Sequence, residues 1–184
     1  MRQPVDQRVG VFVDVQNLYY SARHIYKSKV NFHEILKSAV NGRKLIRAIC
    51  YVIRAEVETE QSFFDALEAI GFEVKMKDLQ VFYGGMKKGD WDVGICVDAI
   101  ELAPKLDTVI VVSGDGDYIP LVLHLQKALG CRVEVLAFGK SCSTKLTEAA
   151  DDFFDLDTDS KKYLIKNERT RRGGQHNKKS PAAT

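Results

Sequence analysis

The sequence lacks the short motifs that carry several common chemistries. It contains no pair of cysteines at CxxC spacing, no P-loop, no GxGxxG turn after a strand and no nucleophile elbow. These absences argue against nucleoside triphosphate hydrolysis, acyl transfer and a dinucleotide cofactor. The four histidines all lie outside the acidic motifs described below, and we expect structural roles for His24, His33 and His124 in helices.

Long hydrophobic runs are missing as well. The apolar segments have the length of strands, far below the ~20 residues of a transmembrane helix, so we expect no membrane partner. The first ten residues, MRQPVDQRVG, have no apolar core of a secretory signal, which predicts a cytoplasmic protein. The cysteines are widely spaced, and we expect them to be reduced and to act as small hydrophobic side chains. They are Cys50, Cys96, Cys131 and Cys142.

An excess of charge of one sign is confined to the C-terminal end. Residues 158–184 hold eight Lys or Arg and two acidic residues, a net charge of +6, which leaves −4 for residues 1–157 because the whole chain carries +2. The length of 184 residues suits one domain with a full core. We therefore predict a folded domain over 1–157 and a basic, flexible tail over 158–184. The tail either aids solubility alone or attracts a nucleic-acid backbone.

Strand-like and helix-like segments alternate along the chain. The expected strands are residues 9–15, 45–54, 72–82, 107–113 and 131–138, and most are continuous apolar runs typical of strands buried on both faces. The expected helices are 17–28, 31–40, 59–70, 91–103, 120–129 and a short one within 143–156. This alternation predicts an α/β fold, a Rossmann-like three-layer sandwich with a mainly parallel central sheet.

Three segments place carboxylates at or near the ends of apolar runs. They are VFVDVQN at 11–17, WDVGICVD at 91–98 and VVSGDGDY at 111–118. Ligands of open α/β sheets bind at the carboxyl ends of the strands, so we expect at least four Asp side chains to share one crevice. Carboxylates packed so closely raise one another's pKa unless a cation lies between them. Oxygen ligands favour Mg²⁺ or Mn²⁺, and the chemistry most suited to such a site acts on phosphates.

The first and third motifs contain the strongest candidates. Asp14 directly follows VFV, and a charged side chain there is costly in a buried strand unless something compensates it. The alternative role of Asp14 and of Asn17 is to cap the following helix. Glycines allow Asp115 and Asp117 to face the strand end, although such a turn often binds only its own backbone. Ser113 either positions a carboxylate or phosphate oxygen, or is an ordinary turn hydroxyl.

The second motif offers Asp92 and Asp98, six residues apart in one helix. That spacing separates them by roughly 240° around an ideal helix, so they cannot share one face. Either could be the ligand and the other a support. Lys87 and Lys88 in the preceding loop are candidates for holding the substrate backbone, and the alternative is a solvated loop.

Together these segments resemble a known family. DVQN at 14–17, KKGDWDVGICVDAI at 87–100 and SGDGDYIPLV at 113–122 resemble the three signature motifs of NYN domains, in the LabA/DUF88 branch of the PIN-like nuclease superfamily. The similarity covers roughly residues 9–156. It implies a sheet of strand order 3-2-1-4-5 and a divalent-metal-dependent ribonuclease that leaves a 5′-phosphate and a 3′-hydroxyl.

The resemblance also assigns roles to residues. It implies catalytic and metal-binding roles for Asp14, Asp92, Asp115 and Asp117, and supporting roles for Asn17, Asp98 and Ser113. Tyr118 stands where the family often has Phe, and we expect this difference to have little effect.

The leading hypothesis is a nuclease that cleaves RNA with Mg²⁺ or Mn²⁺. The alternative is a noncatalytic RNA-binding or regulatory protein of the same fold. A small-molecule phosphatase or Toprim-like enzyme is disfavoured, because DVQN lacks the second Asp of a DxD motif and no separate Glu motif precedes the DGD. A homo-oligomer remains open, since the sequence shows no heptad or other interface pattern.

Overall fold

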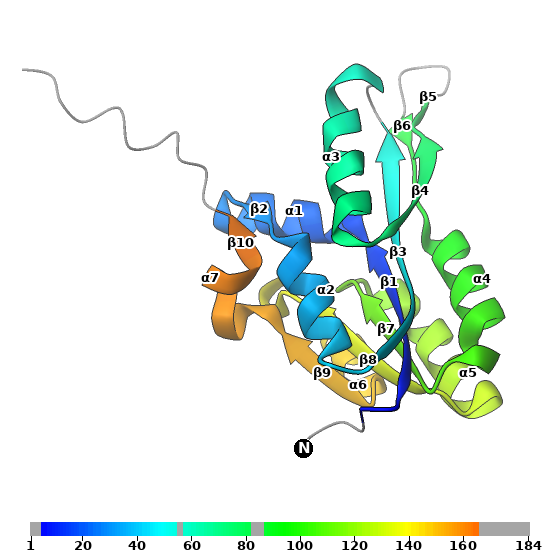
Figure 1. Cartoon of the computed structure of the whole chain (residues 1–184). Helices are drawn as coiled ribbons and strands as arrows, with labels where there is room; N and C mark the ends of the chain where they lie inside the picture. Colours follow the sequence, from blue (N-terminus) through cyan, green and yellow to red (C-terminus); the bar gives the residue numbers. More distant parts are fainter. Residues whose placement is uncertain (1–4, 55–56, 82–86, 166–184) are drawn as a thin grey trace, which may run out of the picture.

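The central sheet of this computed structural model has six strands in the order β4-β3-β1-β7-β8-β9, and all adjacent pairs are parallel (Figure 1). The structure describes residues 5–54, 57–81 and 87–165. The strands are β1 (Arg8–Asp14), β3 (Lys44–Arg54), β4 (Glu73–Asp78), β7 (Thr108–Val112), β8 (Arg132–Ala137) and β9 (Asp152–Asp155). The predicted fold class and the order 3-2-1-4-5 are confirmed, and β9 adds a short edge strand beside β8.

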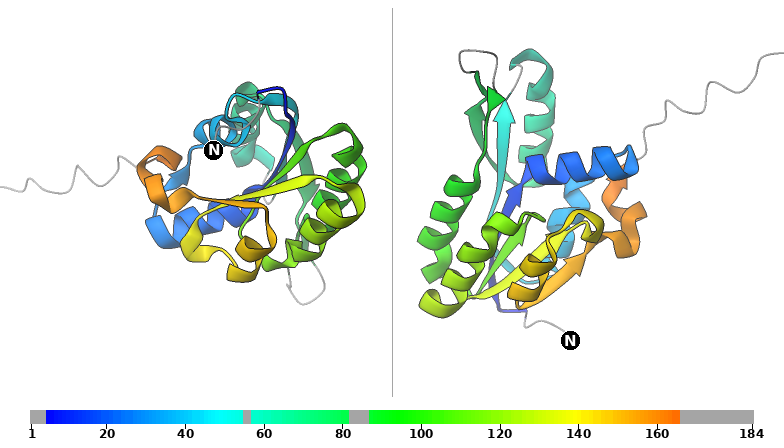
Figure 2. Two further views of the ribbon diagram at one scale, coloured as in Figure 1. Left: turned by 90° about the horizontal axis from the view of Figure 1, so that it is seen from below. Right: turned by 180° about the vertical axis from the view of Figure 1, so that it is seen from behind.

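Helices cover both faces of this sheet (Figure 2). One face carries α1 (Val15–Tyr26), α2 (Phe32–Val40) and α3 (Val57–Ile70), and the other carries α4 (Asp92–Leu102), α5 (Ile119–Leu129) and α6 (Thr144–Ala149). Short 3-10 turns follow several elements: η1 (Ala103–Lys105), η2 (Gly116–Tyr118), η3 (Gly139–Ser141) and η4 (Leu156–Asp159). No helix in the described part of the chain is both long enough and apolar enough to span a membrane.

The two faces of β1 explain why its sequence is apolar without alternation. Val11 and Val13 point into the core under α1 and α2, whereas Phe12 points into the core under α4 and α5. All three are fully buried. Because successive side chains of a strand point to opposite faces, a strand covered on both sides needs hydrophobic residues at every position.

Capping residues set the boundaries of the helices. The side chain of Asn31 accepts a hydrogen bond from the Glu34 N–H at 3.3 Å and caps α2. Helix α2 ends at Asn41 in the left-handed conformation, and α5 ends at Gly130 in the same way. Pro120 lies in the first turn of α5, where its missing N–H costs no helical hydrogen bond.

A buried ion pair holds α2 against the sheet. The guanidinium of Arg43 donates two hydrogen bonds to the carboxylate of Glu134 on β8, at 2.7 and 2.8 Å. Arg43 also donates to the carbonyl of Ala39 at 2.6 Å and to that of Val40 at 3.1 Å. The charges are therefore compensated although both side chains are almost completely buried.

The fold extends beyond the boundary expected from charge. After β9 and η4 the chain forms α7 (Ser160–Tyr163) and β10 (Leu164–Ile165), which pairs antiparallel with β2 (Lys29–Val30). The segment 158–165 is therefore folded, contrary to the flexible tail predicted to begin at 158, because its own packing and strand pairing outweigh its basic composition. The rest of that tail, 166–184, lies outside the described residues.

The connections create a crevice between β1 and β7. These strands are neighbours in the sheet, but β1 continues into α1 on one face, whereas β7 continues through η2 into α5 on the other. Such a reversal leaves the carboxyl ends of the two strands open, and ligands of α/β sheets bind at this point. Asp14 ends β1 and Ser113 follows β7, so the first and third motifs meet here.

Candidate active site

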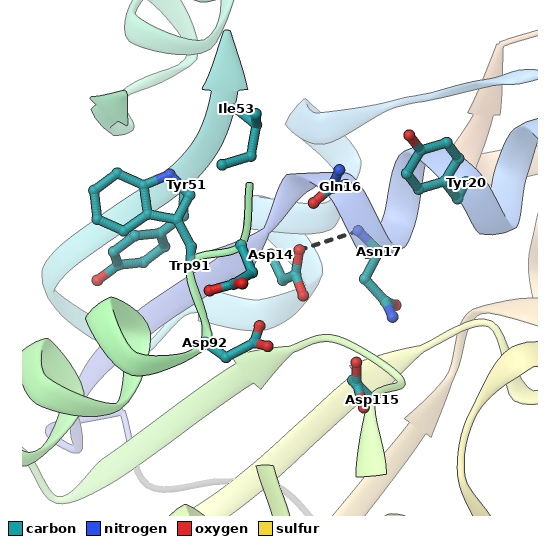
Figure 3. A pocket seen from close by; sticks show the side chains of 10 residues that line it. Asp14, Gln16, Asn17, Tyr20, Tyr51, Ile53, Trp91, Asp92 and Asp115 are labelled. Carbon is teal, nitrogen blue, oxygen red and sulfur yellow. Dashed lines mark hydrogen bonds between the residues drawn. The ribbon is translucent and has the colours of Figure 1, made fainter. Parts of the chain in front are cut away.

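A cleft of about 280 Å³ opens at the carboxyl ends of β1 and β7. The described residues that line it are Asp14, Gln16, Asn17, Tyr20, Tyr51, Ile53, Asp90, Trp91, Asp92 and Asp115. Four of these lining residues are carboxylic acids and none is Lys, Arg or His. Figure 3 shows the carboxyl groups of Asp14, Asp92 and Asp115 directed toward a common space. The cleft therefore concentrates negative charge drawn from all three motifs.

Asp14 both caps a helix and faces the cleft. Its Oδ1 accepts a hydrogen bond from the Asn17 N–H at 3.0 Å, which makes it the N-cap of α1. Its Oδ2 accepts from the Ser113 hydroxyl at 3.2 Å. Burial raises the pKa of Asp14, the hydrogen bond from Asn17 lowers it, and the negative charge of Asp92 raises it again. Asp14 thus has both of the roles that the sequence offered as alternatives: it caps α1 and it lines the cleft.

Asn17 and Ser113 attach the third motif to the first. The Asn17 side-chain carbonyl accepts from the Gly114 N–H at 2.9 Å, and the Ser113 hydroxyl accepts from the Asp115 N–H at 3.3 Å. A Cβ on Gly114 would lie 3.0 Å from the Cα of Cys142, so the turn packs too closely for a larger residue. These contacts fix the position of Asp115 relative to Asp14.

Asp92 reaches the same place from the second motif through Tyr118. Asp92 is the first residue of α4, whose N-cap is Trp91. Tyr118 is fully buried, and its hydroxyl donates a hydrogen bond to Asp92 Oδ1 at 3.1 Å. The Tyr118 hydroxyl oxygen also lies 3.4 Å from Asp14 Oδ2. The two carboxylate oxygens are therefore at most about 6.5 Å apart, the sum of these distances. One hydroxyl carries one proton, so it can serve only one carboxylate at a time.

The electrostatics of the cleft follow from burial and like charge. Burial raises the pKa of Asp92, and the negative charges of Asp90, Asp115 and Asp117 add to this, while the Tyr118 hydrogen bond opposes it. Burial and the charges of Asp14 and Asp92 raise the pKa of Tyr118, so its hydroxyl stays protonated at neutral pH. No basic residue among the described lining residues thus balances the negative charge of the cleft carboxylates.

Trp91 builds an aromatic wall and holds the second motif in place. Its indole N–H donates to the carbonyl of Val52 at 2.8 Å, and its ring centroid lies 5.4 Å from that of Tyr51. The ring covers Gly94, where a Cβ would come within 2.5 Å of it. The Lys77 ammonium lies 5.1 Å from the Trp91 ring centroid and donates to the Asp90 carbonyl at 3.1 Å. The packing explains why the motif combines Trp with Gly at this spacing.

Some predicted site residues lie apart from the cleft lining. Asp98 faces away from Asp92 and accepts hydrogen bonds from the Tyr51 hydroxyl at 2.6 Å and from Lys75 Nζ at 2.7 Å. Asp117 is exposed and donates its backbone N–H to Asp115 Oδ1 at 3.0 Å. Asp98 therefore supports Tyr51, and Asp117 contributes to the cleft through its charge on Asp92.

The two loop lysines can be placed only by their backbone. Residues Lys87–Lys88 form β6, which pairs antiparallel with β5 (Gln80–Val81). Their side chains lie outside what the structure describes, so a contact with substrate stays a prediction.

The sequence interpretation missed several lining residues. They are Gln16, Tyr20, Tyr51, Ile53, Asp90 and Trp91. Tyr20 could have been predicted from helical periodicity, because Asn17 and Tyr20 are three residues apart and share one face of α1. The Tyr118 hydroxyl was also missed. The expectation that Tyr in place of Phe matters little ignored a hydroxyl that lies between Asp14 and Asp92.

The donor atoms of the cleft fit a hard divalent cation. Carboxylate oxygens are the ligands that Mg²⁺ and Mn²⁺ prefer, and the uncompensated charge of Asp14 and Asp92 favours a cation between them. Within the described residues, however, no three His, Cys, Asp or Glu side chains already form a metal-binding group. The described carboxylates that could hold such an ion are those of Asp14, Asp92 and Asp115.

Comparisons with known proteins agree with this architecture. A sequence model described as the NYN domain matches residues 8–157. The chain is 24% identical over 177 residues to the low amplitude and bright protein LabA of Synechococcus elongatus, which covers 88% of this chain and 90% of LabA. It also resembles the crystal structure of a protein of unknown function from Vibrio parahaemolyticus, with 35% identity and a TM-score of 0.80, over 90% of this chain and all of that one.

Proposed function

Because the chain belongs to the NYN domain family, which forms part of the PIN-like nuclease superfamily, we propose that it is a divalent-metal-dependent ribonuclease that hydrolyses RNA phosphodiester bonds. The observation that carries the proposal is the meeting of Asp14 and Asp92 at one buried hydroxyl, that of Tyr118. Carboxylates from two motifs, separated by almost eighty residues of sequence, are thereby held together at the sheet's topological switch point. This is the position where open α/β sheets bind their ligands.

The positions of the residues support the roles that we propose for them. Asp14 and Asp92, with Asp115 beside them, would hold Mg²⁺ or Mn²⁺, which when bound lowers the pKa of water and neutralises charge on the scissile phosphate. Asn17 and Ser113 keep the first and third motifs in register through their hydrogen bonds to the 113–115 turn. The Tyr118 hydroxyl donates a hydrogen bond to Asp92 at 3.1 Å and lies 3.4 Å from the carboxylate of Asp14.

The cleft without a cation is unsuited to an anionic substrate. Its described lining carries four carboxylic acids, and the phosphates of RNA would be repelled by them. Binding of RNA at this place therefore depends on a cation, while Trp91 and Tyr20 provide aromatic surface at the edge of the cleft. Lys87 and Lys88 are proposed to hold the backbone of the substrate on the side of α4.

The test is cleavage of RNA by the purified protein with Mn²⁺, with Mg²⁺ and with chelator. We expect metal-dependent cleavage by the wild type and a loss of about 100-fold or more in Asp14→Asn and Asp115→Asn, as is usual when a preorganised charged group is removed. The control is Asp107→Asn, because Asp107 precedes β7 at the opposite end of that strand and pairs with Arg8. Equal cleavage by the wild type and both cleft variants would refute the proposal.

A second candidate is a noncatalytic RNA-binding or regulatory protein. The finding that favours it is the lack of a ready-made metal group among the described carboxylates. It predicts salt-sensitive RNA binding without turnover, and weaker binding when the chain is shortened after Ile165. The removed segment, 166–184, holds six Lys or Arg and one Glu, a net charge of +5. Each lost phosphate contact reduces the slope of log affinity against log salt by about 1.

A further inference from the structure

Helix α1 extends away from the acidic cleft, and one side of this helix exposes aromatic and basic residues to solvent. Tyr19 and Tyr20 are 43% and 49% exposed, which is high for large side chains, and Arg23 and His24 in the next turn are exposed as well. The opposite side of α1, including Leu18 and Ala22, is buried in the core. The exposed side is therefore not part of the hydrophobic core.

The charge of this face is opposite to that of the cleft. Residues 15–33 contain no Asp or Glu, while the rest of the folded part is acidic overall. Arg23, Lys27 and Lys29 are exposed along the helix and just beyond its end. Tyr26 of this helix contacts Asp157, but the charged residues that α1 itself presents are all basic, and such a cluster attracts a polyanion.

The two tyrosines are held differently. Arg23 donates to the Tyr19 hydroxyl at 2.6 Å, and its guanidinium carbon lies 5.8 Å from the Tyr19 ring centroid. Tyr20 contacts Tyr19 edge to face, with ring centroids 5.7 Å apart, and His24 at 5.9 Å. Half of the Tyr20 side chain stays open to solvent, and this residue also lines the cleft (Figure 3). Tyr20 is thus an aromatic surface directly beside the carboxylates.

The far end of α1 lies near α7 and β10. Figure 2 shows α1 running from the end of β1 toward α7, and β10 at this end pairs with β2. The basic sequence 166–184 begins directly after β10. The cleft therefore lies at one end of α1, and α7 and β10 lie at the other.

We propose that the exposed face of α1 binds the part of a single-stranded RNA that lies outside the cleft. One base stacks on Tyr20, and the adjoining phosphates lie near Arg23, Lys27 and Lys29. Unpaired bases are required, because a base inside a duplex does not offer its face to an aromatic side chain, whereas bases of a single strand stack on such residues without sequence preference. The inference rests on the proposed function for the choice of RNA as the ligand.

The first experiment measures binding by fluorescence anisotropy of labelled single-stranded and double-stranded RNA of equal length. It is done in chelator, so that nothing is cleaved and only contacts outside the acidic cleft contribute to binding. Tyr20→Ala is expected to weaken binding of the single strand about tenfold. Tyr20→Phe keeps the ring and should bind like the wild type. Phe154→Ala is the matched control, because Phe154 is a 40% exposed aromatic residue on the edge strand β9.

The second experiment tests the charges of the same face. The double variant Lys27→Glu and Lys29→Glu should weaken binding and make its salt dependence shallower. The control double variant Lys105→Glu and Lys127→Glu has the same change of net charge at exposed lysines in η1 and α5. It should retain most of the affinity, since only the long-range attraction is reduced.

The inference is overturned if Tyr20→Ala binds the single strand like the wild type, if duplex RNA binds as tightly as the single strand, or if the two double variants are equally impaired. These outcomes are separable from the proposed function. Cleavage by the wild type with unchanged binding by Tyr20→Ala refutes the α1 surface alone. Binding that depends on Tyr20, without any metal-dependent cleavage, supports the α1 surface and refutes the nuclease.

Discussion

The hydroxyl of Tyr118 lies 3.1 Å from Asp92 Oδ1 and 3.4 Å from Asp14 Oδ2. The proton of this hydroxyl therefore lies between two carboxylates that come from different motifs. Tyr118 itself is fully buried. The arrangement brings two negative groups together without requiring them to touch. It keeps one oxygen of each carboxylate within about 6.5 Å of the other, and a hydrogen-bond donor between them lowers the free-energy cost of placing two negative charges close together.

The first prediction concerns this hydroxyl. Tyr118→Phe removes it with little change of volume, and Asp14 and Asp92 lose the donor that lies between them. We expect the free energy of unfolding to change by only about 1 kcal/mol. Cleavage and Mn²⁺ affinity should fall about 10- to 100-fold, the usual cost of losing a group that orients metal ligands. Enzyme kinetics and calorimetric titration of Mn²⁺ measure these quantities.

The control for Tyr118→Phe is Tyr26→Phe. Tyr26 also donates its hydroxyl to a carboxylate, Asp157, but this pair joins the end of α1 to η4, away from the cleft lining. It should alter stability without altering Mn²⁺ affinity. An equal effect of both variants on Mn²⁺ affinity would show that the position of Tyr118 is not special.

A second prediction follows from the raised pKa of Asp14. Between the ordinary pKa of Asp, about 4, and the higher value that burial imposes on Asp14, the folded protein binds more protons than the unfolded chain. The free energy of unfolding therefore decreases as pH rises through this window, and the loss persists at neutral pH. Asn cannot titrate and caps a helix as well as Asp does. Asp14→Asn should thus be more stable than the wild type at pH 7.

Thermal unfolding of both proteins in chelator, at pH 7 and well below pH 4, checks this prediction. The gain in stability of Asp14→Asn should shrink at the lower pH, where the wild-type carboxyl is protonated in both states. An equal gain at both values would contradict the assignment of the gain to the charge of Asp14.

A third prediction concerns the buried ion pair. Glu134→Gln leaves the guanidinium of Arg43 buried without its full counter-charge, so we expect a loss of about 3 kcal/mol in the free energy of unfolding. Glu73→Gln is the matched control, since Glu73 also pairs with an arginine, Arg47, but both side chains are substantially exposed. Its loss should stay within about 1 kcal/mol because solvent screens the pair. Equal losses in urea unfolding would contradict this view.

Much of the sheet could be predicted because each strand carries its own signal. The continuous apolar run at 9–15 belongs to a strand covered on both faces, and Asp14 marks where it leaves the core. Strand β9 was missed because Asp152–Asp155, sequence DFFD, is short and only half-buried. Its position depends on pairing with β8, which local sequence does not encode.

The site could be predicted in part for similar reasons. Helical geometry showed that Asp92 and Asp98 cannot share a face, but it could not choose between them. The choice depends on long-range partners, Tyr118 for Asp92 and Tyr51 with Lys75 for Asp98. Such contacts join residues 23 to 47 positions apart, so they are visible only once the chain is folded.

The most direct test of the central claim, that the cleft carboxylates form a divalent cation site, is the anomalous scattering of Mn²⁺ in crystals soaked with manganese. We predict a peak in contact with the carboxylates of Asp14 and Asp92, adjacent to Asp115, which disappears in crystals of Asp14→Asn. Manganese bound only elsewhere on the molecule, or a peak unchanged by Asp14→Asn, would contradict the account.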